Sequence, residues 1–153
     1  MTTAAPTPPG PFIGQLIGQA ERATRAVLDT LLDHLGLRFE EWVGLRQLTM
    51  LGGATSRTEL ASALHTGSRL DPDRADAAID AILDRGWVTG TDDGTLTSTA
   101  AGRAQHDDIA ARITATSQRL YGHLAADELA VLRRALTDIT VRAEVEAGLR
   151  PAS

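Results

Sequence analysis

Apolar residues recur at helical spacing along most of the 153-residue chain, and they divide it into a series of amphipathic helices. The first and the last two expected helices are long, and each carries an apolar stripe larger than one small core requires. The expected helices span about Ile13–Leu35, Phe39–Leu48, Thr58–Leu64, Asp71–Arg85, Ser98–Gly122 (with its cap at Thr97 or Ser98) and Ala126–Ala147. A partner subunit would bury the excess apolar surface, so the pattern favours a dimer.

The middle of the chain carries the clearest local signals. A break is expected at His65–Ser68, after which Asp71 suits the N-cap of a new helix, followed by a proline at the first helical position, where its missing N–H costs nothing. Gly86 suits the helix stop. Short strands at Trp87–Thr89 and Thr95–Thr97 then flank an Asp-Gly turn. Helix, turn, helix and hairpin together predict a winged helix-turn-helix.

An ordered set of short motifs resembles the MarR family of dimeric regulators. The motifs are Leu35–Trp42, Leu60-Ala61-x-x-Leu64, Ile79-Asp80-x-Ile82-x-x-Arg85-Gly86-Trp87-Val88, Leu96-Thr97-x-x-x-x-Gly102-Arg103 and Leu124–Arg134. The resemblance runs from about Ile13 to Glu146. It implies a mainly α fold with a small β-hairpin wing, in which long dimerisation helices intertwine in a homodimer.

This resemblance sets the expected domain organisation. Residues 1–10 are expected to be a disordered tail, and residues 11–153 a single MarR-like domain. Within that domain, residues 11–36 and 104–147 would be dimerisation helices, residues 38–103 the winged-helix core, and residues 87–97 the wing. No apolar stretch approaches the ~20 residues that span a bilayer, and the start of the chain lacks the features of a signal peptide. A soluble cytoplasmic protein without membrane contact is therefore expected.

Composition complicates the expected binding of double-stranded DNA. The net charge is −5, and all 15 basic residues are arginine. The resemblance implies a recognition helix at Asp71–Arg85, with reading positions at Asp73, Arg74, Asp76 and Ala77. Between residues 57 and 103, five arginines face eight acidic residues, a net charge of −3 where phosphate neutralisation should supply affinity. The expected DNA contacts are Arg57, Arg69, Arg74 and Arg103, with the last supporting the wing.

The resemblance also implies an effector pocket between the dimerisation helices and the winged-helix core. Its polar and aromatic candidates are His34, Arg38, Trp42, Arg46 and His106. An arginine beside a tryptophan would suit an anionic aromatic effector. A tryptophan such as Trp42 is more often a plain core residue, and the default expectation for Arg46 is an ion pair, with Glu41 or with an acid of the partner chain.

No catalytic set can be placed at a defined geometry. The four histidines show no metal-ligand spacing, there is no cysteine, and no cofactor motif occurs, so neither a metal nor a cofactor is expected. Two hypotheses remain. The chain is a ligand-responsive regulator that binds a near-palindromic DNA site as a homodimer, or it is a MarR-like protein that has lost DNA binding and uses its pocket as a small-molecule binding protein or an enzyme.

Overall fold

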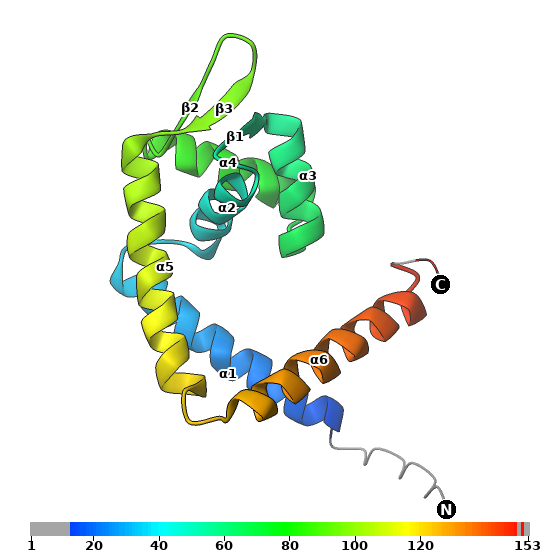
Figure 1. Cartoon of the computed structure of the whole chain (residues 1–153). Helices are drawn as coiled ribbons and strands as arrows, with labels where there is room; N and C mark the ends of the chain where they lie inside the picture. The colour runs from blue at the N-terminus through cyan, green and yellow to red at the C-terminus, as the bar shows by residue number, and fades with distance from the viewer. Residues whose placement is uncertain (1–12, 150, 152–153) are drawn as a thin grey trace, which may run out of the picture. The chain divides into compact units, whose positions relative to one another are not determined.

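The computed structural model describes residues 13–149 and 151, so the expected tail at residues 1–10 lies outside the described residues. Within the described residues, six helices and three short strands follow one another (Figure 1). They are α1 (Ile13–His34), α2 (Phe39–Met50), β1 (Ala54–Ser56), α3 (Arg57–Ser68), α4 (Pro72–Asp84), β2 (Val88–Gly90), β3 (Thr95–Ser98), α5 (Ala100–Tyr121) and α6 (Ala126–Glu146). The mainly α winged-helix fold expected from the sequence is confirmed. The chain forms two compact units, which divide within α5 between Ile113 and Thr114.

Helix α3 begins where expected but ends later. Ser56 caps it, because its hydroxyl accepts a hydrogen bond from the Glu59 N–H at 3.2 Å. The break expected at residues 65–68 is wrong: the helix continues to Ser68 and ends at Arg69, which adopts a left-handed φ of 55°. The predicted break included Gly67, a residue type that often ends helices. A Cβ there would meet the Gln47 amide nitrogen at 2.5 Å, so this glycine allows a close approach inside a helix and does not end it.

Helix α4 follows its local signals closely. Asp71 accepts a hydrogen bond from the Arg74 N–H at 2.9 Å, and Pro72 occupies the first helical position. The chain leaves the helix at Gly86, which has a left-handed φ of 69° that glycine adopts with little strain. The capped start and the glycine stop fix the length of this helix, and with it the distance from the turn to the wing.

The wing is part of a three-stranded antiparallel sheet in the order β1-β3-β2. Ala54 pairs with Thr97, and Val88 pairs with Ser98. Strand β1 was not foreseen, because a strand of three residues after the Gly52-Gly53 pair has no readable alternation. The expected cap of α5 at Thr97 or Ser98 is also wrong, since both residues belong to β3.

Thr99 is the residue that caps α5. Its hydroxyl accepts from the Gly102 N–H at 3.0 Å and donates to the Gly86 carbonyl at 2.8 Å. Gly102 lies directly on the backbone of Trp87, where a Cβ would come within 2.1 Å of the carbonyl oxygen. The base of the wing is therefore held against the first turn of α5 at a position that accepts only glycine.

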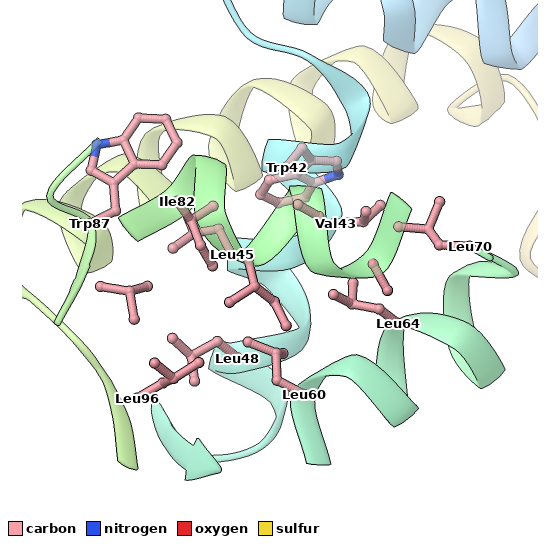
Figure 2. Packing of buried hydrophobic residues seen from close by; sticks show 14 of the residues in the cluster. Trp42, Val43, Leu45, Leu48, Leu60, Leu64, Leu70, Ile82, Trp87 and Leu96 are labelled. Atoms are coloured by element: carbon pink, nitrogen blue, oxygen red, sulfur yellow. The ribbon is translucent and has the colours of Figure 1, made fainter. Parts of the chain in front are cut away.

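The core of the first unit forms where α2, α3 and α4 meet (Figure 2). Its fully buried side chains include Leu45 and Leu48 from α2 and Leu60 and Leu64 from α3, as well as Ile82 from α4. Each such side chain contributes roughly 1.5–3 kcal/mol on burial. Trp87, the residue before β2, packs in the same core cluster.

The second unit contains the end of α5 and all of α6. Ala125 offers no side-chain cap to α6, but its own N–H donates to the Glu128 carboxylate at 2.8 Å. None of the 21 residues of α6, all of them described, is buried. Large apolar side chains are exposed along the helix: Val131, Leu132, Leu136 and Ile139. Among the described residues, no helix is long and apolar enough to cross a membrane.

Candidate nucleic-acid interface

Helix α4 presents one apolar face to the core and one charged face to solvent. Ala75, Ala78, Ile79 and Ile82 are buried, whereas the residues at the expected reading positions are exposed. Those exposed positions are Asp73, Arg74, Asp76 and Ala77. The outward face thus combines acceptor side chains, one guanidinium and one methyl group, which are groups able to meet base edges or phosphates in a major groove.

Arg74 lies in the first turn of α4 and forms an ion pair with Glu40 of α2. The hydrogen bond from this guanidinium lowers the pKa of the Glu40 carboxyl group below its ordinary value. Arg74 remains about half exposed, at 53% for its side chain, and Glu40 is less exposed, at 26%. The principal arginine of the expected reading helix is therefore held by a carboxylate of its own chain.

Arg57 at the start of α3 is held by two carboxylates of α4. Its Nη2 atom lies 2.9 Å from Asp80 and 3.3 Å from Asp76. Because all three side chains are at least 40% exposed, this triad is open to solvent and to ions. The triad ties the start of α3 to the middle of α4, across the turn of the helix-turn-helix.

Arg85 fastens the other end of α4 to the start of α2. Its guanidinium bonds both oxygens of Glu41, at 3.1 and 3.3 Å, and the carbonyl of Gly36 at 2.9 Å. It also lies over the Trp87 ring, 5.2 Å from the ring centroid. Glu41 is almost fully buried, at 4% exposure, and accepts a further hydrogen bond from the Arg38 N–H. This cluster is a fixed structural joint between α2 and α4.

The other two expected DNA contacts lie at the edges of this surface. Arg69 is the left-handed residue at the end of α3, just before the turn. Arg103 donates to the Ser98 carbonyl at 2.7 Å and so joins the first turn of α5 to the end of β3. At the wing tip, Asp93 accepts from the Thr95 N–H at 3.0 Å and from the Thr91 hydroxyl, so this acid builds the turn.

Two of the five expected pocket residues contact each other. The rings of Trp42 and His106 stack at 5.7 Å between centroids, inclined by 23°. Trp42 is buried, and the half-buried His106 contacts Asp107 at 3.1 Å through Nδ1. The other three expected residues, His34, Arg38 and Arg46, are exposed.

The Arg46 side chain does not pair with Glu41, one of the two partners considered for it. The Glu41 carboxylate contacts Arg85 and Arg38 instead. This pairing could not be predicted from the sequence, because the arginine that binds Glu41 lies 44 residues away in the chain. Glu40 and Asp80 were missed in the same way as partners of Arg74 and Arg57.

Comparison with known proteins identifies the fold. The sequence matches no family model and no curated protein. Among solved structures, the chain resembles the DNA complex of the Mycobacterium tuberculosis MarR family protein Rv2887, with 25% identity, a TM-score of 0.66, and 83% of this chain and 96% of that chain covered.

Two further solved structures carry ligands. CouR from Rhodococcus jostii RHA1 bound to p-coumaroyl-CoA shares 22% identity with a TM-score of 0.68, covering 83% of this chain and 90% of that chain. An organohalide-sensing transcriptional regulator bound to 2,4-dichlorophenol shares 14% identity with a TM-score of 0.72, covering 95% of this chain and 91% of that chain. The resemblance found in the sequence is confirmed for the fold, because the chain shares the winged-helix fold of these MarR-family structures.

Proposed function

We propose that the protein is a ligand-responsive transcriptional regulator that binds a near-palindromic DNA site as a homodimer. The observation that carries this proposal is the exposed face of α4, which carries Arg74 in its first turn and two carboxylates of the Arg57 triad in its middle. In winged-helix regulators of this kind, the second helix of the helix-turn-helix enters the major groove and places its first turns at the base edges. One solved neighbour is a DNA complex, which supports the same role here.

The homodimer is supported by helix α6. Its exposed leucine, isoleucine and valine side chains leave a helix of 21 residues without a buried side. An exposed apolar surface of this kind marks an interaction site. A second copy would bury the same surface on both subunits, and two-fold symmetry would then place two recognition helices on half-sites about one helical turn apart.

The DNA contacts in this proposal are Arg57, Arg69, Arg74 and Arg103. They are few, and acidic residues outnumber arginines in the helix-turn-helix and wing. Because each neutralised phosphate releases counterions, a small number of contacts gives modest affinity with a shallow dependence on salt. The proposal therefore includes weak binding to random duplexes and relies on base contacts from α4 for its specificity.

The effector would bind near the stacked rings of Trp42 and His106. Two solved neighbours hold a small aromatic phenol and an aromatic CoA thioester, which supports an aromatic ligand. The partly exposed imidazole of His106, stacked on the buried Trp42, offers a ring surface to such a group, and the exposed guanidinium groups of Arg38 and Arg46 offer positive charge for an anionic substituent. His34, at the end of α1, completes the set of proposed pocket residues.

The test is binding to a duplex selected from a random library, compared with an unselected duplex, over a series of salt concentrations. We expect preference for the selected duplex and an affinity that falls as salt rises. Arg74→Ala should weaken both complexes and reduce the salt slope by about one. Arg112→Ala is the matched control, because Arg112 is an equally exposed arginine paired with an acid on α5. If no duplex binds at low salt, the small-molecule binding protein or enzyme becomes the better explanation.

A further inference from the structure

Two neighbouring glutamates of α2 each hold one arginine of α4, and the two ion pairs differ in burial. Glu41, which binds Arg85, has 4% of its side chain exposed, whereas Glu40, which binds Arg74, has 26% exposed. The arginines lie eleven residues apart, so they project from one side of α4, three turns apart. Helix α2 therefore forms ion pairs with both the start and the end of the recognition helix, on the same side of it.

The inner ion pair, Glu41 with Arg85, is not available to bind DNA. The Glu41 carboxylate already accepts from the Arg85 guanidinium and from the Arg38 N–H, and Arg85 is further bound to the Gly36 carbonyl. Breaking this set would leave a buried charge without a partner, which strongly favours the closed arrangement. The inner pair thus fixes α4 on α2 whether or not DNA is present.

The outer ion pair, Glu40 with Arg74, can exchange its carboxylate for another anion. Arg74 is about half exposed and stands in the first turn of α4, where a helix in the major groove approaches the phosphates. An arginine binds a carboxylate and a phosphate with the same forked set of donors, so one anion can replace the other. Exposed ion pairs are weak, and the exchange needs no movement of the helix itself.

We propose that Glu40 is an internal competitor of DNA phosphate for Arg74, so that binding exchanges the carboxylate for a phosphate and lowers the affinity of the protein for every duplex. This inference rests on the proposed DNA binding and adds its regulation. Glu40 lies outside the reading helix and acts through Arg74. It is thus a determinant of affinity that needs no contact with DNA.

Arg57 provides an internal comparison. It is shared between Asp76 and Asp80, so that removing one acid leaves the other in place. Glu40 is the acid that contacts the Arg74 side chain. Neutralising Glu40 should therefore have a larger effect on DNA affinity than Asp80→Asn, although both changes remove one negative charge from the same surface.

The experiment is a double-mutant cycle on DNA affinity, with the wild type, Glu40→Gln, Arg74→Ala and the double variant. Each is titrated against the selected and the unselected duplex over a range of salt concentrations. Asp108→Asn is the matched control, because it frees Arg112, which is exposed to about the same extent as Arg74, from an ion pair on α5. Circular dichroism spectra and melting curves of all variants establish that each is folded.

We expect Glu40→Gln to tighten both complexes about threefold to tenfold. In the Arg74→Ala background the same change should alter affinity less than about twofold, as should Asp108→Asn.

Two results would overturn the inference and leave the proposed function intact. One is an equal gain from Glu40→Gln with and without Arg74, because a general loss of negative charge would then explain the gain. The other is a wild type that prefers the selected duplex and gains nothing from Glu40→Gln. Failure of all four proteins to bind any duplex would overturn the proposed function, and this inference with it.

Discussion

The joint between Arg85 and Glu41 gives the most specific stability prediction. Arg85→Met keeps the apolar stem and removes three hydrogen bonds, two to Glu41 and one to the Gly36 carbonyl. Stranding one partner of a fully buried pair costs about 3–5 kcal/mol. Arg85 itself is 42% exposed, and Glu41 retains the Arg38 N–H, so the expected loss is smaller, about 2–3 kcal/mol of unfolding free energy.

Urea unfolding at one fixed protein concentration measures this loss, because association would otherwise change the apparent stability. We expect a lower midpoint with an unchanged slope, and a melting temperature lower by roughly 4–10 °C. The double variant Glu41→Gln with Arg85→Met should lose less than the sum of the two single losses, since it leaves no unpaired buried charge. A loss below about 0.5 kcal/mol for Arg85→Met would refute the reasoning, as would strict additivity in the cycle.

Three further predictions concern packing, pH and assembly. Gly102→Ala should destabilise the protein by more than about 2 kcal/mol in thermal unfolding, because the new Cβ meets the Trp87 backbone, whereas Gly14→Ala, with open space around it, should not destabilise. The Glu40 pKa is lowered in the folded state, so the ionised carboxylate stabilises the fold at pH values above its ordinary pKa of 4.5. The wild type should therefore be more stable than Glu40→Gln at those pH values. The urea-unfolding curves of the two proteins should converge as the pH falls below 4.5. Leu136→Glu should shift the protein towards monomer in sedimentation velocity, and an unchanged mass would contradict the assigned interface.

The elements that were predicted well are those defined by neighbours in the chain. Asp71 and Pro72 start α4 and Gly86 ends the turn after it, through contacts within a few residues. Such capping and turn signals act locally, so they can be read directly from the sequence. The winged-helix fold follows from their order.

The errors have non-local causes. Gly67 was predicted to lie in a break, but it belongs to α3, where the Gln47 side chain from α2 lies close beside it. Strand β1 exists because β3 pairs with it, and its three residues carry no pattern of their own. Tertiary contacts decided both cases, and a single sequence does not display them.

In the candidate site too, local features could be predicted from the sequence and non-local contacts could not. Arg74 could be named from its place at the start of the recognition helix, but its pairing with Glu40 spans 34 residues. The charge count shows that acidic residues outnumber arginines between residues 57 and 103, but it does not reveal that Arg57 and Arg74 are held by carboxylates of the same chain. Which arginine meets which acid depends on how α2 and α3 cross α4.

Hydroxyl-radical footprinting of the selected duplex tests the central claim most directly. A homodimer reading a near-palindromic site through α4 predicts two protected half-sites related by symmetry, with centres about one helical turn apart, and protection that is lost in Arg74→Ala. A single protected segment, or uniform protection along the duplex at the concentrations that saturate binding, would contradict the claim.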